Sequence, residues 1–203
     1  MVALRVACGR QGSGVETVAL GVRNTVGFDF DPKDGSLWFT NNGRDWLSED
    51  LPIDTLNRVS APGKQHFGFP FCHQGDFTEP EFGWGKDCND YAKPALLTGP
   101  HAGTLGMLGM RFSTGRQFPA RYQGAIFMAR HGSRNRTQKF ATDVMVAWPD
   151  GKGGIARAEP FLTGLIEKNE YLGRPVDMLV MKDGSMLVSD DHDGAIYRIS
   201  YQP

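Results

Sequence analysis

The sequence predicts an all-β protein, built as part of a β-propeller, and three observations lead to this prediction. Helical periodicity is nearly absent, apolar residues come in short runs closed by turn signals, and a ten-residue pattern recurs along the chain. The chain also contains 26 glycines and 12 prolines, a composition that favours short strands and tight turns over helices. We therefore expect antiparallel sheets with few helices.

The short apolar runs predict strands, because residues that favour turns bound each of them. Asp-Gly pairs stand between several runs, at 34–35, 150–151, 183–184 and 193–194, and they suit the positive φ angles of hairpin turns. The expected strands cover residues 27–30, 37–39, 125–129, 144–148, 178–181, 186–188 and 195–199.

The strongest evidence for a propeller is an internal repeat. Residues 33–42 and 182–191 both read Lys-Asp-Gly-Ser, three apolar residues, a hydroxyl residue and two Asn or Asp, and 123–132 is a looser copy. Their spacing allows units of about 45 to 60 residues, the size of four-stranded blades, and gives about two and a half to three blades. A closed propeller needs about four to eight, so either the chain is a fragment or another copy completes it. Unrelated hairpins that share the same turn chemistry are the alternative interpretation.

We interpret residues 1–203 as one partial propeller with a long loop insertion at about 60–104. This stretch is rich in glycine, proline and aromatic residues, and long ordered loops are usually functional or cross-linked. Cys72 and Cys88 bracket a part of it that has little apolar material, so a disulfide would restrict its unfolded ensemble. Two free thiols are the alternative, and Cys8 is left over.

Composition argues against several function classes. The formal net charge of −1 does not indicate binding to nucleic acid or to an anionic membrane. No apolar run approaches the roughly 18 residues needed to span a bilayer. Residues 1–10 do not resemble a signal peptide, because Arg5 interrupts the apolar stretch. If the parent protein is exported, we expect its export signal outside this chain.

The repeat brings polar residues from distant segments together, because loops of neighbouring blades converge near a propeller axis. Arginine forks bind carboxylates in a bidentate manner, and carbonyl or carboxylate oxygens suit Ca²⁺. We therefore expect a pocket for a flat, polyanionic ligand with a calcium ion. The blade ends that would form it are 23–24, 41–44, 130–133, 174 and 189–192.

Several segments together resemble the soluble glucose/sorbosone dehydrogenase family, and most closely its L-sorbosone dehydrogenase-like branch. The likeness covers nearly everything from about Gly12 onward. It implies a six-bladed propeller that holds pyrroloquinoline quinone (PQQ) and calcium and oxidises sugars or related aldehydes. It also implies a periplasmic or secreted parent protein. The matching segments are 21–24, 40–46, 54–58, 66–70, 130–133, 173–177, 187–191 and 194–199.

The resemblance also implies roles for individual residues. Gly43 and Arg44 match two successive backbone carbonyls that bind calcium. The family's catalytic base is a histidine in an earlier blade, to which no part of this chain corresponds, so we expect no catalytic residue here. The positions that match or lie near family contacts to PQQ are Arg23, Asn24, His131, Arg174 and Asp190.

Other interpretations remain open at this stage. The chain could be a non-catalytic propeller remnant used for binding, or a calcium-dependent lactonase-type propeller, which the paired arginines disfavour. Arg174 could instead pin its turn against Asp177, and His131 could be a structural loop histidine. Asp54 and Asn57 could line a calcium site or cap a turn. The substrate, the electron acceptor and the oligomeric state are not determined by the sequence, although an open propeller can associate with itself.

Overall fold

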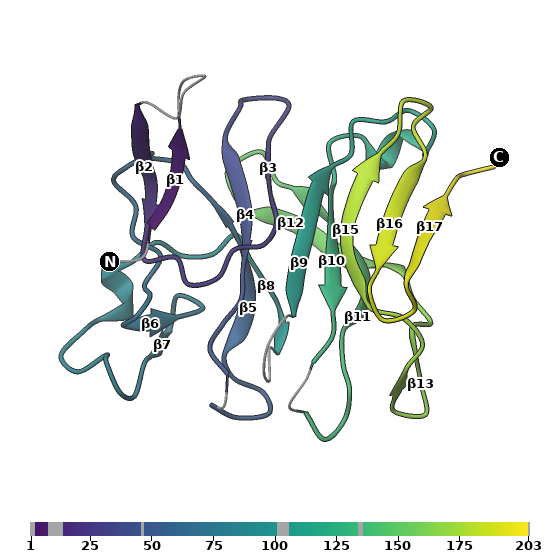
Figure 1. Cartoon of the computed structure of the whole chain (residues 1–203). Helices are drawn as coiled ribbons and strands as arrows, with labels where there is room; N and C mark the ends of the chain where they lie inside the picture. Colours follow the sequence, from purple (N-terminus) through teal and green to yellow (C-terminus); the bar gives the residue numbers. More distant parts are fainter. Residues whose placement is uncertain (1–2, 8–13, 46, 101–105, 134–135, 203) are drawn as a thin grey trace.

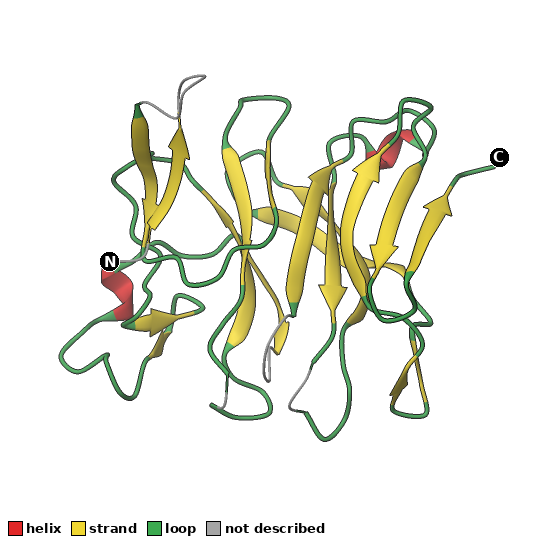
Figure 2. Cartoon of the chain, in the orientation of Figure 1, coloured by secondary structure: helices red, strands yellow, loops and turns green. Residues whose placement is uncertain are grey.

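The computed structural model describes residues 3–7, 14–45, 47–100, 106–133 and 136–202, and it is almost entirely β-structure (Figures 1 and 2). In this part of the chain the helices are two 3-10 turns, Cys88–Asp90 and Ala120–Tyr122. The all-β prediction is therefore confirmed. No helix of the described ranges is long and apolar enough to cross a membrane.

Three antiparallel sheets stand side by side as propeller blades (Figure 1). From the innermost strand outward, blade 1 has the order β3-β4-β5-β8, blade 2 has β9-β10-β11-β12, and blade 3 has β15-β16-β17. The inner strand β9 contacts both β3 and β15, so the blades pack around a common axis. The bounds are Phe28–Phe30 (β3), Leu37–Asn41 (β4), Ile53–Arg58 (β5), Leu96–Pro100 (β8), Met107–Phe112 (β9), Ile126–His131 (β10), Thr142–Pro149 (β11), Ile155–Leu162 (β12), Pro175–Val180 (β15), Met186–Asp190 (β16) and Ala195–Ile199 (β17).

Three two-stranded hairpins flank these blades. The first lies beside blade 1, the second belongs to the insertion, and the third precedes blade 3 (Figure 1). Their strands are Ala3–Ala7 (β1) with Val15–Leu20 (β2), Cys72–His73 (β6) with Phe77–Thr78 (β7), and Ile166–Glu167 (β13) with Glu170–Tyr171 (β14).

The two close copies of the sequence repeat form equivalent hairpins. In blade 1, Asp34 Oδ1 accepts the Ser36 N–H at 2.8 Å, and Arg58 of the third strand donates to both side chains. The Asp-Gly-Ser turn is therefore tied to the third strand of its blade. Blade 3 repeats these contacts with Asp183, Ser185 and Arg198.

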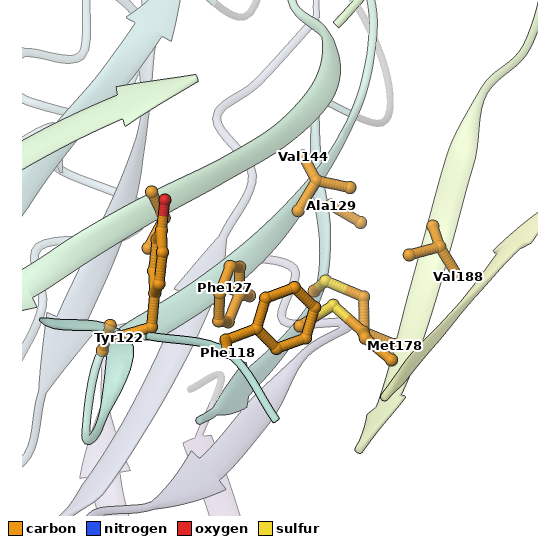
Figure 3. Packing of buried hydrophobic residues seen from close by; sticks show 10 residues of the cluster. Phe118, Tyr122, Phe127, Ala129, Val144, Met178 and Val188 are labelled. Carbon is orange, nitrogen blue, oxygen red and sulfur yellow. The ribbon is translucent and has the colours of Figure 1, made fainter. Parts of the chain in front are cut away.

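Buried side chains fill the spaces between neighbouring blades. Between blades 2 and 3, Phe118 and Phe127 form one cluster with Met178 and Val188 of blade 3 (Figure 3). In blade 2, the Phe127 ring lies 4.8 Å from that of Phe161 and 6.5 Å from that of Phe118. Between blades 1 and 2, the rings of Trp38 and Phe112 meet edge-on at 6.1 Å. These contacts fix the blades relative to one another, and so they fix the loops at the blade ends.

The insertion differs from the expected loop at 60–104, because its last part is the strand β8, which pairs with β5 and completes blade 1. The strands β5, β9 and β12 are among those that were missed: polar residues interrupt the apolar residues of β5 and β12, and β9 was not recognised although it is mostly apolar. Asp54 and Asn57, expected at a calcium site or a turn, lie buried within β5. A disulfide joins Cys72 to Cys88 with a Cα–Cα distance of 5.7 Å, so the expected bridge is confirmed. Cys8, Trp46 and His101 lie outside the described residues.

Candidate functional site

The candidate site lies at one end of the blades, opposite the Asp-Gly-Ser turns, at the lower end in Figure 1. The loops that enter β3 and β15 meet there with the loops that leave β4, β10 and β16. The loop geometry is set by the same inter-blade packing that forms the core. Residues from the whole length of the chain therefore occupy one end of the molecule.

In blade 1, side chains at the end of β4 fix the loop that enters β3. Asn41 Oδ1 accepts the N–H groups of Arg23 and Asn24, both at 3.1 Å. Asn42 donates its N–H to Asn24 O at 2.9 Å, and its Oδ1 accepts the Met107 N–H of blade 2 at 2.8 Å. The main-chain N–H and the carbonyl of Asn24 are thus both hydrogen-bonded, while no described residue hydrogen-bonds its side-chain amide.

The segment that follows β4 carries the two expected calcium-binding carbonyls. Asp54 Oδ1 accepts the Gly43 N–H at 2.9 Å, which anchors the segment to β5. The Arg44 guanidinium reaches Glu79 at 2.5 Å and Glu81 at 3.0 Å, toward the disulfide-bridged segment. No donor among the described residues binds the carbonyl oxygen of Gly43 or Arg44. These oxygens fit a hard cation such as Ca²⁺, although the described residues contain no cluster of three or more His, Cys, Asp or Glu side chains that could hold a metal.

Arg23 presents its guanidinium beside this segment with weak internal contacts. Its Nη1 lies 3.4 Å from Asn42 O, and its Nη2 lies 3.8 Å from a carboxylate oxygen of Asp45. The side chain is 25% exposed, so its remaining donors can reach a ligand. Behind it, a polar cavity of about 20 Å³ separates 41–43 from the insertion, a volume that suits one water molecule.

Arg174, at the entry to blade 3, holds an unsatisfied buried donor. Its Nε donates to His131 O at 2.9 Å, and its guanidinium lies 4.7 Å from the centre of the Tyr171 ring. Its Nη2 is buried and has no partner among the described residues. Such an orphaned donor costs about 1–3 kcal/mol, so the site favours an anionic acceptor. Asp177, the alternative partner considered from the sequence, pairs with Arg111 instead.

His131 lies beside Arg174 and is only 2% exposed. Its Nε2 is 2.8 Å from Asp191 Oδ1, while its buried Nδ1 has no hydrogen-bond partner within the described ranges. Burial lowers the pKa of His131 below its usual value, and the hydrogen bond with Asp191 only partly opposes this effect. Thr142, its neighbour across the β10–β11 pair, also has a buried hydroxyl to which no described residue hydrogen-bonds. A neutral imidazole, a hydroxyl and a guanidinium thus have unused polar atoms in one region.

Asp190 lies in the same region, and main-chain N–H groups of the protein hydrogen-bond its carboxylate. Its Oδ2 accepts the Arg174 N–H at 2.8 Å, and its Oδ1 accepts the N–H groups of His192 and Asp193 at 2.9 and 3.1 Å. Asn41 makes the corresponding contacts in blade 1. The Asp190 carboxylate thus holds the Arg174 main chain, and its direct contact to a cofactor stays a prediction.

Contacts connect the two halves of the candidate site. Asn42 binds Met107, the preceding Gly106 carbonyl accepts the His131 N–H at 2.8 Å, and the His131 carbonyl binds Arg174. Sequence reasoning missed Tyr171 and Glu79, because neither belongs to the repeat: Tyr171 ends the short strand β14, and Glu79 follows β7. Asn41 and Asp191 belong to the blade ends that the sequence predicted for the pocket.

Two buried histidines and one half-buried histidine predict a stability that depends on pH. Burial lowers the pKa values of His66, His73 and His131 below 6.5 in the folded protein. The unfolded chain therefore binds more protons, and the free energy of unfolding should fall as the pH drops below about 6.5. Urea unfolding at pH 7.5 and 5.5 should show a lower midpoint at pH 5.5. His131→Gln should reduce this difference and the exposed His192→Gln should not; equal midpoints in the unmodified chain would contradict the argument.

The part of the chain that the structure describes forms a partial β-propeller, and known proteins match this fold and its sequence. Residues 6–141 match the model of the Glucose / Sorbosone dehydrogenase family, and the chain belongs to that family. It is 36% identical over 191 residues to an uncharacterized protein of Borreliella burgdorferi, an alignment that covers 92% of this chain and 49% of the relative.

Solved structures show the same fold at low sequence identity. An enzyme of carbohydrate-active family AA12 from Trichoderma reesei has a TM-score of 0.75 and 20% identity, over 90% of this chain and 53% of its own. The PQQ domain of pyranose dehydrogenase from Coprinopsis cinerea has a TM-score of 0.73 and 22% identity, over 93% and 56%. The soluble aldose sugar dehydrogenase of Escherichia coli has 0.60 and 20%, over 88% and 45%. The chain therefore spans about half the length of the proteins it matches.

Proposed function

We propose that this chain is one half of an oxidoreductase that acts on sugars or sugar aldehydes. In this proposal the chain is the half that binds PQQ and calcium, and it is inactive by itself. The observation that carries the proposal is the buried Nη2 of Arg174 at the blade end, for which the described part of the chain provides no partner. A donor in this position gains a charge-assisted hydrogen bond when a carboxylate-bearing ligand binds. Membership of the Glucose / Sorbosone dehydrogenase family supports the same chemistry.

In this proposal the chain's residues bind and orient the cofactor. Arg174 and Arg23 bind carboxylate groups from two sides, the Asn24 amide adds a neutral contact, and the carbonyls of Gly43 and Arg44 bind calcium. The chemistry that PQQ and calcium supply when bound is two-electron oxidation assisted by a Lewis acid.

The neutral His131 belongs to the same proposed site. The imidazole lies next to Arg174, and its hydrogen bond to Asp191 through Nε2 fixes the ring. No described residue hydrogen-bonds Nδ1, so this atom can accept a contact from a bound ligand. We propose that Asp190 contributes indirectly, by holding the Arg174 main chain. A lactone substrate offers no polyanion for two arginines to bind, which disfavours the lactonase-type alternative.

The compartment and the partners of the parent protein are part of the proposal. Disulfides such as Cys72–Cys88 form and persist in oxidising compartments, which supports a periplasmic or secreted parent. A sugar or sugar-derived aldehyde, including sorbosone-type compounds, is the proposed substrate. The electron acceptor is left open.

Titration of the chain with PQQ tests this function directly. PQQ absorbance should change in a saturable manner when the chain and Ca²⁺ are both present, and removal of Ca²⁺ by a chelator should weaken the binding. The exposed Arg157→Ala variant, altered in the outer strand β12, should bind as the unmodified chain does. If PQQ does not bind with or without Ca²⁺, the cofactor assignment is wrong.

A further inference from the structure

A buried charge network joins the disulfide-bridged segment to the proposed calcium carbonyls. The Glu79 carboxylate is 2% exposed and lies 2.5 Å from Arg44 Nη1 through one oxygen and 2.5 Å from His73 Nε2 through the other. Arg44 Nη2 also binds Glu81 at 3.0 Å, but that carboxylate is 60% exposed. The two acidic partners of Arg44 thus differ sharply in their access to solvent.

The protein fixes the main chain of Glu79 on both sides. Its N–H donates to Phe71 O at 2.9 Å, and its carbonyl accepts the Gly83 N–H at 2.8 Å. The segment is closed by the Cys72–Cys88 disulfide and tied to β5 by Gln74, whose Oε1 accepts the Ile53 N–H at 2.7 Å. A carboxylate held this firmly can fix the position of the side chain that it binds.

The position of the Arg44 side chain matters for a cation bound beside it. The guanidinium belongs to the same residue as one of the two free carbonyls, so it would repel a calcium ion bound there. Glu79 holds the guanidinium against the disulfide-bridged segment and offsets its charge in a buried environment, where solvent screens little. Glu81 is exposed, and solvent screening weakens its effect.

We propose that Glu79 is a positioning residue for the calcium site: it holds and neutralises the Arg44 side chain so that the carbonyls of Gly43 and Arg44 can bind a cation. This inference rests on the proposed function, because the calcium site itself belongs to that proposal. In this proposal the insertion has a function, because it places Glu79 next to blade 1. The proposal also accounts for the buried carboxylate on an otherwise irregular segment.

Matched variants of the full chain test the proposal through metal affinity. Glu79→Gln keeps the size of the side chain and one acceptor oxygen, removes the charge and replaces the second oxygen by an NH2 group. Glu81→Gln makes the same change at the exposed partner. Calcium binding is measured by calorimetry without PQQ. We expect Glu79→Gln to weaken Ca²⁺ binding by about ten- to a hundredfold, and Glu81→Gln to change it by less than about threefold.

A double variant separates charge compensation from loss of folding. Arg44→Gln combined with Glu79→Gln removes both charges and keeps the residue 44 carbonyl, so Ca²⁺ affinity should return to within about threefold of the unmodified chain. If Glu79→Gln fails to fold, this neutral pair still gives the test. Unchanged affinity in Glu79→Gln, or a double variant that binds weakly despite a folded circular dichroism spectrum, overturns the inference. Absence of Ca²⁺ binding by the unmodified chain would instead overturn the calcium part of the proposed function.

Discussion

Supplied with PQQ and Ca²⁺, the 203-residue chain alone should not oxidise glucose, sorbosone or other aldoses at an enzymatic rate. Abstraction of a sugar hydroxyl proton needs a positioned base with a pKa near the working pH, and loss of such a base typically lowers the rate about 10²–10⁴-fold. By its resemblance to the family, that base belongs to a blade to which no segment of this chain corresponds. The expected turnover is therefore well below about 1 s⁻¹.

The described histidines support this expectation, because each already has a structural partner. His66 Nδ1 accepts the Gly68 N–H at 3.1 Å, and His192 Nε2 lies 3.1 Å from Tyr171 O. The Nε2 atoms of His73 and His131 contact Glu79 and Asp191. The most suitable of them, His131, is buried at 2% exposure, which restricts its access to a substrate hydroxyl.

Dye reduction under saturating PQQ and Ca²⁺ measures the turnover. Sedimentation of the same sample shows whether copies associate, since Leu179 and Ile196 leave apolar surface on blade 3 at 55% and 70% exposure. Turnover of about 1 s⁻¹ or more would show that a base is present after all. In that case His131→Gln is the first variant to make, and loss of turnover without loss of PQQ binding would identify it.

Replacement of Arg174 by alanine should weaken PQQ binding by about one to two powers of ten. A charge-assisted contact contributes roughly 1.5–3 kcal/mol, and each 1.4 kcal/mol is about tenfold in affinity. Arg174 is the residue with the largest expected effect, because its Nη2 is buried and unpartnered before any ligand binds. Arg174→Lys should recover only part of the affinity, since lysine lacks the planar fork.

The Arg174 variant needs a control for stability, because the side chain also contacts His131 and Tyr171. Thermal unfolding without ligand measures that contribution separately. Arg157→Ala in β12 is the matched control, since Arg157 packs on Trp148 at a distance of 4.0 Å from its ring centre and is largely exposed. Equal PQQ affinity of Arg174→Ala and the unmodified chain would remove Arg174 from the proposed site.

The sequence by itself determined the blade architecture, because the signals for it are local. An Asp-Gly-Ser turn between two apolar runs specifies a hairpin wherever it occurs, and the close copies at 33–42 and 182–191 form equivalent hairpins in blades 1 and 3. The Cys72–Cys88 pairing was also predictable, since the two cysteines bracket a segment with little apolar material. Strands β5 and β12 were missed because polar residues interrupt their apolar residues, and β9 was missed although its sequence is mostly apolar.

Only the tertiary structure decided which polar atoms remain available to a ligand. Three N–H groups from nearby loops hydrogen-bond the Asp190 carboxylate, and the sequence does not show these contacts. Arg44 and Glu79 meet because the insertion folds back on blade 1, and Arg174 reaches His131 because blades 2 and 3 pack together. The physical reason is that hydrogen-bond and charge partners are chosen by distance in space. The spacing of residues along the chain does not encode that distance.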